Sequence, residues 1–214
     1  MARLKEYNGH YCESEYEYAF IGFLEAEGWK YSSGNNISRV TKRDVLIADD
    51  FKKFIADTNP DLTEDEVIQI YDNVRLVGAE SDFATLHKVY GWMVNGVQFT
   101  TQDGLPRMIP LIDFDNWDKN IFRVVNQFTV EYTNNGQKEN RRPDVLLFVN
   151  GMPLCVIELK NPADANATIY DAWEQINIRY WRDIPHLLHY CPLACISDGV
   201  KTRLGTVRTP YEHF

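Results

Sequence analysis

Two apolar stretches joined by an Asn-Gly pair constrain the fold of this chain more than any other feature. Residues 145–149 read Val-Leu-Leu-Phe-Val, residues 154–157 read Leu-Cys-Val-Ile, and Asn150-Gly151 lies between them. Short apolar runs of this kind are typical of buried strands, and Asn-Gly is the strongest short-range signal of a β-hairpin. We therefore expect a hairpin in the core of the molecule.

Three charged residues flank these apolar strands. Asp144 precedes the first strand, and Glu158 and Lys160 follow the apolar run of the second. Burying two carboxylates together is costly unless a cation neutralises them, and Glu158 and Lys160 share a face because side chains alternate along a strand. Two carboxylates and an ammonium at the edge of a sheet suit metal-assisted phosphodiester hydrolysis. The alternative is a solvated surface ion pair worth roughly 0–1 kcal/mol, which the apolar flanks disfavour.

This hypothesis sets a condition on the hairpin. A strict two-residue loop would pair Asp144 with Ile157 and would set Asp144 and Glu158 on opposite faces of the sheet. A three-residue loop or one β-bulge would instead point both carboxylates the same way. Pro153 lacks an N–H group and disturbs the ladder just after the turn. The site hypothesis therefore predicts a non-ideal hairpin.

Each of these residues has an expected chemical role. Asp144, Glu158 and the backbone carbonyl of Leu159 offer hard oxygen ligands suited to Mg²⁺, with Mn²⁺ as the expected substitute. The ion would polarise a phosphoryl oxygen and lower the pKa of an attacking water. Lys160 would orient that water or stabilise charge in the transition state.

Composition and charge limit the possible classes of protein. The chain has 214 residues, 44% of them apolar, and a net charge of −9, which argues weakly against a stand-alone DNA-binding protein. There is no apolar run near the ~20 residues that cross a bilayer and no signal-peptide pattern, so no membrane association and a cytoplasmic location are expected. The phosphate loops of the Walker and dinucleotide types are absent, as is Gly-x-Ser-x-Gly.

Periodicity predicts an α/β core with helices on both faces of a mixed sheet. The expected helices cover residues 13–28, 43–57, a segment capped by Thr63, 81–94 and 164–182, and residues 32–38 are expected to form a loop. The expected strands cover residues 97–101, 108–113, 122–133, the two arms of the hairpin, 193–197 and 200–204.

Several motifs together point to one family. They lie at residues 111–116, 124–130, 141–144, 156–162, 172–176 and 196–199. Over nearly the whole chain they resemble the N-terminal region of the motor (R) subunit of type I restriction enzymes. The resemblance implies a PD-(D/E)-x-K, restriction-endonuclease-like fold, in which a mixed central β-sheet is flanked by helices and a helical and β-hairpin insertion follows the first helix. It also implies one nuclease domain over residues 1–214, with its core at about 13–30 and 122–205 and its insertion at about 35–120.

The resemblance also implies a function. Members of this family cleave double-stranded DNA with Mg²⁺, after translocation driven by ATP in motor domains that this chain lacks, and work with modification and specificity subunits. The chain would then be a fragment of a longer motor subunit, and the isolated chain is expected to bind DNA feebly. The competing hypotheses are a catalytically degenerate nuclease fold that docks DNA or other subunits and, more remotely, a small-molecule α/β enzyme.

Individual residues can be matched to the family pattern. Asp144, Glu158 and Lys160 match its aspartate, acidic residue and lysine, and Glu17 matches a first-helix glutamate that reaches the metal, although Glu17 also suits the helix dipole.

Related nucleases carry Gln-x-x-x-Tyr on the following helix, whereas here Gln175 and Tyr180 are five apart. In an α-helix that spacing turns Tyr180 away and leaves Arg179 on the face of Gln175. We expect Gln175 to contribute to catalysis and to contact DNA, with Arg179 or Tyr180 as its partner; the alternative is a solvated Gln175.

Overall fold

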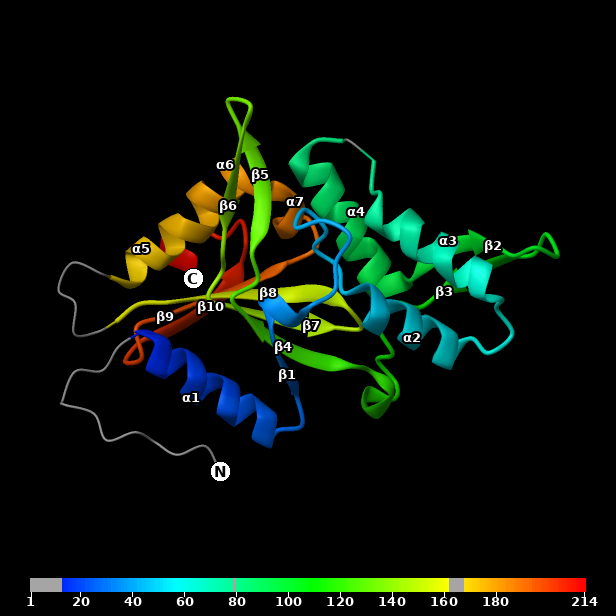
Figure 1. The fold of residues 1–214 in the computed structure, drawn as a ribbon, viewed down its shortest axis with the longest axis horizontal. Coiled ribbons are helices and arrows are strands. Elements are labelled where there is room, and N and C mark those ends of the chain that lie inside the picture. The colour runs from blue at the N-terminus through cyan, green and yellow to red at the C-terminus, as the bar shows by residue number, and fades with distance from the viewer. Residues whose placement is uncertain (1–12, 79, 162–167) are drawn as a thin grey trace.

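A six-stranded mixed sheet forms the centre of the molecule (Figure 1). The computed structural model describes residues 13–78, 80–161 and 168–214. Strands β1 and β4 are parallel, as are β8 and β9, and the other neighbours are antiparallel. The strand order is β1 (Lys30–Ser33), β4 (Phe122–Asn126), β7 (Val145–Val149), β8 (Met152–Leu159), β9 (Leu193–Ser197) and β10 (Thr202–Thr206).

Helices cover both faces of this sheet, as the alternation of side chains along its strands requires. On one face Val145 and Ile157 pack against helix α1 (Glu13–Ala26). On the other face Leu146 and Val156 belong to the main core, together with residues of a helical segment that follows β8. That segment consists of α5 (Ile169–Glu174), η3 (Gln175–Tyr180), α6 (Trp181–Asp183) and α7 (Pro185–Leu188). The expected α/β fold with a mixed, helix-flanked sheet is confirmed.

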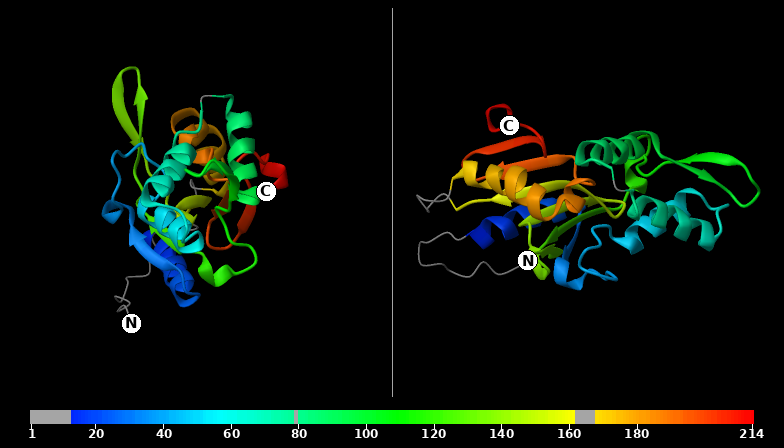
Figure 2. Two further views of the ribbon diagram at one scale, coloured as in Figure 1. Left: turned by 90° about the vertical axis from the view of Figure 1, so that its right-hand side faces the viewer. Right: turned by 90° about the horizontal axis from the view of Figure 1, so that it is seen from above.

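The region between β1 and β4 contains the helices and the hairpin that were expected after the first helix. Figure 2 shows these elements extending from one end of the sheet. Thr63 and Glu66 form the expected capping box, and Ser81 caps the next helix. The elements are η1 (Gly34–Asn36), α2 (Ala48–Thr58), α3 (Glu64–Arg75), α4 (Asp82–Asn95), β2 (Val97–Thr100), β3 (Pro106–Ile109) and η2 (Trp117–Lys119).

The single strand predicted over residues 122–133 is wrong. The chain leaves the sheet after β4 because Gln127 adopts a positive φ of 57° and Phe128 turns into the core, where it is fully buried. Gly34 permits this close approach, since a Cβ there would lie 2.5 Å from the Cα of Phe128. Beyond this break β5 (Val130–Asn134) and β6 (Gln137–Arg141) form a separate two-stranded ribbon.

Other predicted boundaries also differ from the structure. The helix expected from residue 43 begins at Ala48, and the backbone N–H of the preceding Ile47 donates to the carbonyl of Gly151 at 2.8 Å. Strand β1 lies where a loop was expected to begin at residue 32. The strand expected over residues 108–113 stops before Pro110, which has no N–H for a ladder.

The predicted helix over residues 164–182 is described from Ile169 onward, and residues 164–167 lie outside the described residues. The strand expected over residues 200–204 is shifted to β10, and the short helix η4 (Tyr211–His213) follows it. Within the described ranges, no helix is long and apolar enough to cross a membrane.

Candidate active site

The hairpin of β7 and β8 is non-ideal, as the site hypothesis predicts, and of the two expected irregularities it has the β-bulge. Its Asn-Gly turn is tight, with both residues at positive φ. The register of the ladder then shifts once, which leaves Leu154 as the extra residue on β8, and Val145 pairs with Ile157. Because the ladder continues in that register, Asp144 lies opposite Glu158 rather than opposite Ile157. The condition set by the site hypothesis is met.

The carboxylate of Glu158 is fully buried and hydrogen-bonded by two side chains from the helical segment after β8. The Tyr180 hydroxyl donates to Oε1 of Glu158 at 2.6 Å, and Nε2 of Gln175 donates to Oε2 at 2.6 Å. Across the hairpin, Oδ2 of Asp144 accepts from the backbone N–H of Leu159 at 2.8 Å. Burial and the neighbouring charge of Asp144 raise the pKa of Glu158 well above its ordinary value.

Lys160 joins this cluster at the end of β8. Its Nζ atom donates to Oε1 of Gln175 at 3.2 Å, so one amide side chain connects the lysine to Glu158. A cavity of about 230 Å³ between α1 and the strands is also lined by Lys160. The structure therefore brings together four predicted site residues, namely Asp144, Glu158, Lys160 and Gln175.

The prediction that Tyr180 turns away from Gln175 is wrong. Residues 175–180 form a π-helix, in which residues five apart share a face, and Nε2 of Gln175 donates to the Tyr180 hydroxyl at 2.9 Å. Arg179, expected to share the face of Gln175, is exposed and lies 3.9 Å from Glu174. With 1% of its surface exposed, Tyr180 contacts Glu158, while DNA contact by Gln175, Arg179 or Tyr180 stays a prediction.

Removing one exposed residue from the π-helix is expected to restore an α-helix without breaking this cluster. Deletion of Ile178, which is 48% exposed, places Gln175 and Tyr180 four apart, on one face of an α-helix. The helical residues before and after the deletion keep the same sides turned towards the core. The free energy of unfolding should therefore change by less than about 1 kcal/mol in urea denaturation.

The matched control is a deletion of Lys53, an exposed residue in the regular α-helix α2. It rotates Phe54 and Ile55 by about 100° out of the core and should cost about 3–5 kcal/mol. Equal losses in the two deletion variants would contradict the assignment of residues 175–180 as a one-residue insertion.

Glu17 approaches the cluster from α1. Its side chain is 6% exposed, and Nδ2 of Asn126 donates to its Oε1 at 2.5 Å. The Tyr31 hydroxyl in turn donates to Oδ1 of Asn126 at 3.0 Å. Burial raises the pKa of Glu17, and the charge of Asp144 adds to the rise. Asn126 and Tyr31 were not identified as site residues from the sequence. The available signal was the amide side chain of Asn126, which lies at the end of a buried strand.

The donor set fits a divalent cation held mainly by two carboxylates. The charges of Asp144 and Glu158 repel each other, and Glu158 is fully buried, so water does not screen that repulsion. A divalent cation bound between the two carboxylates would offset it. The backbone N–H of Leu159 donates to Asp144, while metal ligation by the carbonyl of Leu159 stays a prediction. In the described residues no three His, Cys, Asp or Glu side chains form a group that could hold a metal, so Glu17 does not complete a three-carboxylate cluster. Metal ligation by Glu17 stays a prediction.

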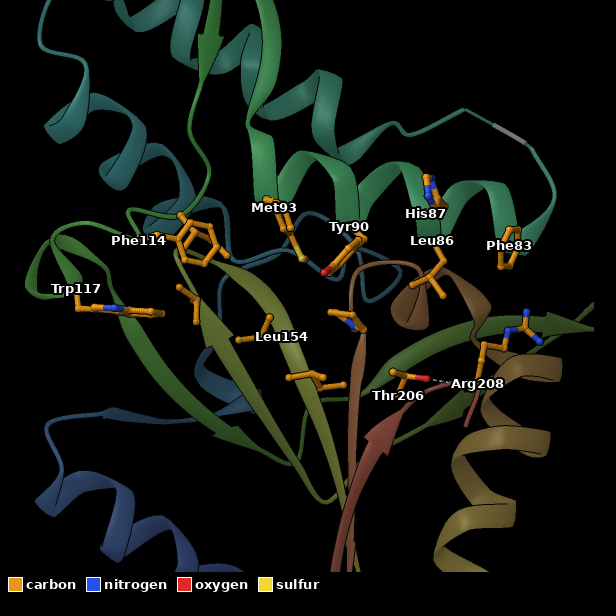
Figure 3. A pocket seen from close by; sticks show the side chains of 15 residues that line it. Phe83, Leu86, His87, Tyr90, Met93, Phe114, Trp117, Leu154, Thr206 and Arg208 are labelled. Carbon is orange, nitrogen blue, oxygen red and sulfur yellow. Dashed lines mark hydrogen bonds between the residues drawn. The ribbon is translucent and has the colours of Figure 1, made fainter. Parts of the chain in front are cut away.

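A larger cavity of about 860 Å³ lies away from this cluster (Figure 3). Helix α4 contributes Phe83, Tyr90 and Met93 to its wall, and Trp117 and Leu154 lie on other elements around it. Its lining contains no carboxylate and none of the predicted site residues. This cavity therefore offers no carboxylate ligand for a divalent metal, unlike the cluster at the hairpin.

Known proteins are similar to this chain over most of its length. Residues 11–213 match the family model described as "Type I restriction enzyme R protein N terminus". A putative type I restriction enzyme MjaIXP endonuclease subunit of Methanocaldococcus jannaschii is 34% identical over 92% of this chain and 20% of that protein. The type I restriction enzyme HindI endonuclease subunit of Haemophilus influenzae is 31% identical over 94% of this chain and 20% of that protein. The chain thus spans about a fifth of the length of these relatives.

Proposed function

Because this chain belongs to the family of type I restriction enzyme R protein N termini, we propose that it hydrolyses DNA phosphodiester bonds with a divalent metal ion. The observation that carries the proposal is the bulged hairpin, which sets Asp144 opposite Glu158 with Lys160 beside them. The names of the two relatives as endonuclease subunits support it.

Asp144, Glu158 and the carbonyl of Leu159 would hold Mg²⁺ or Mn²⁺, with Glu17 close by as a further acid. When bound, such an ion supplies polarisation of a phosphoryl oxygen and a lowered pKa of an attacking water. Both oxygens of Glu158 already accept one hydrogen bond, but a carboxylate has about four lone-pair sites in all, so ligation remains open to it.

The protein's own side chains would prepare this site for the reaction. Tyr180 and Gln175 fix the orientation of the Glu158 carboxylate, and the same Gln175 amide directs the Lys160 ammonium towards the cluster. An ammonium held in place can orient a water or stabilise negative charge on the phosphoryl oxygens. In this arrangement Tyr180 acts as a positioning residue for Glu158.

The chain spans about a fifth of the length of its relatives, and we assign the remaining functions to parts of the system other than this chain. We assign ATP-driven translocation along double-stranded DNA to motor domains beyond this chain, and target choice to the modification and specificity subunits of a restriction complex. The net charge of −9 supports this division, because phosphate binding needs local Lys and Arg in excess.

A second candidate is a degenerate nuclease fold that docks DNA or subunits. The satisfied hydrogen bonds of Glu158 favour it, since an inert core would also require them. The contact of two carboxylates argues against it, because a docking module gains nothing from their repulsion.

Plasmid nicking separates the two functions. At high concentration the chain should nick supercoiled DNA with Mg²⁺ or Mn²⁺ and not with EDTA, and a Glu158→Gln variant should lose this activity. Glu64→Gln, at an exposed position at the start of α3, is the matched control and should keep it. Nicking that persists in EDTA or in Glu158→Gln would contradict the proposed function.

A further inference from the structure

We propose that the ribbon of β5 and β6 is an arm that lies in a groove of duplex DNA bound at the candidate active site. This inference rests on the proposed function, since it names the surface that would hold the substrate of that site. The occupant is duplex DNA, contacted mainly at its phosphates, and no base sequence is implied.

The shape of the ribbon fits a DNA groove. Each strand has five residues, so the ribbon extends about 17 Å. Figures 1 and 2 show it projecting away from the sheet as a separate hairpin, and residues 133–138 at its tip are exposed. The major groove of B-DNA is about 12 Å wide and admits a two-stranded β-ribbon.

The base of the ribbon is held by contacts with the rest of the protein, while its tip is exposed. Val130 is fully buried and Tyr132 is 7% exposed, and the Tyr132 hydroxyl donates to Glu139 at 2.6 Å. Arg141 forms a salt bridge of 2.6 Å with Asp183 of α6. An arm fixed at its base loses less conformational entropy on binding than a flexible loop would.

The two faces of the ribbon differ in chemistry. Tyr132, Glu139 and Arg141 share the face whose contacts hold the base. Lys138 and Asn140 alternate with them and therefore project from the other face, and both are exposed. Exposed Arg142 follows β6, and neither Lys138 nor Arg142 forms a salt bridge within the described residues.

The exposed face of the ribbon leads directly to the candidate active site. β6 ends at Arg141, and Asp144 follows after only two residues. The charge of Arg142 also acts on Glu17, which places that cation beside the acidic cluster. In an acidic chain, Lys138 and Arg142 are two exposed cations between the ribbon and Asp144 that can contact a phosphate backbone, and Glu131 is the carboxylate on the same face of the ribbon as Lys138.

The test measures the salt dependence of DNA binding by the full chain without metal. Fluorescence anisotropy with a duplex of about 30 base pairs, from low to moderate salt, gives the slope of log K against log salt. Lys138→Ala/Arg142→Ala should reduce that slope by about 1.8, at about 0.9 per lost phosphate contact. Lys30→Ala/Lys53→Ala removes the same charge from exposed positions on β1 and α2 and should change the slope far less.

Three results would overturn the ribbon proposal. The first is an equal salt slope for the two double variants, and the second is an equal loss of slope in the ribbon variant when single-stranded DNA replaces the duplex. The third is no binding by the wild-type chain at low salt with duplex at about 1 mM, a concentration above the usual range of Kd for non-specific binding. A parallel Mn²⁺ titration separates this failure from failure of the proposed function. If metal binds and depends on Asp144 while the ribbon variant matches its control, only the ribbon proposal fails.

Discussion

Replacing Asp144 with asparagine is expected to lower metal-dependent DNA cleavage by about three to four orders of magnitude. Loss of the ion's stabilisation of charge, worth several kcal/mol, corresponds to that factor at 1.36 kcal/mol for each tenfold change in rate. The fold should survive, because an asparagine oxygen can still accept the hydrogen bond from the backbone N–H of Leu159. Plasmid nicking measures the loss.

The same substitution should raise stability in the absence of metal. The charge of Asp144 raises the pKa of Glu158, which means that the two ionised carboxylates repel each other. A neutral asparagine removes that repulsion, and we expect the free energy of unfolding in EDTA to rise by about 0.5–2 kcal/mol. Opposite changes in activity and stability distinguish a functional carboxylate from a structural one.

Asp118→Asn, at an exposed position, is the matched control for Asp144→Asn and should change neither quantity. Cleavage by Asp144→Asn within tenfold of the wild type would contradict the proposed role of Asp144. So would a loss of cleavage that merely follows a loss of stability in urea.

Replacing Lys160 with alanine is expected to reduce cleavage by about 10²–10³-fold, the usual cost of removing one group that stabilises charge in the transition state. Metal binding should persist, because the carboxylates that would hold the ion remain. Gln175 loses the hydrogen bond from Lys160 but keeps its contact with Glu158. Parallel measurements of nicking and of Mn²⁺ affinity check both statements.

Lys30→Ala, at an exposed position on β1, serves as the control for the loss of one positive charge. If Lys160 were a solvated ion-pair residue, both variants would retain cleavage. A variant of Lys160 that lost metal binding together with cleavage would instead show that the lysine supports the acidic pair and not the reaction.

The hairpin shows what could be predicted from the sequence. Asn150-Gly151 indicated the turn, and the need to point Asp144 and Glu158 the same way required one extra residue, either in the loop or as a β-bulge in the ladder. Pro153, which cannot donate to the ladder, indicated where regular pairing fails. The structure has the extra residue directly after it, at Leu154.

The π-helix could not be predicted by the same kind of reasoning. Spacing rules for helices assume 3.6 residues per turn, and on that assumption Tyr180 points away from Gln175. The geometry is instead favoured by tertiary contacts, because the buried Tyr180 hydroxyl bonds both to Gln175 and to the fully buried Glu158. Local propensity contains no term for those contacts.

Strand β1 and Asn126 illustrate a second limit. The sequence of β1, Lys-Tyr-Ser-Ser, has no apolar pattern, and the strand exists because it pairs in parallel with β4. Asn126, the last residue of β4, bonds to Glu17, which is 109 positions away. Glu17 was a candidate through family resemblance. Its partner Asn126 could be identified only by knowing that the end of β4 lies next to α1.

Calorimetric titration of Mn²⁺ tests most directly whether Asp144 and Glu158 form a metal site. The wild-type chain should show saturable binding, which Asp144→Asn and Glu158→Gln should lose while Asp118→Asn keeps it. Binding that is unchanged in both site variants would contradict the proposed function, and the chain would then be better explained as a nuclease fold that docks DNA or partner subunits.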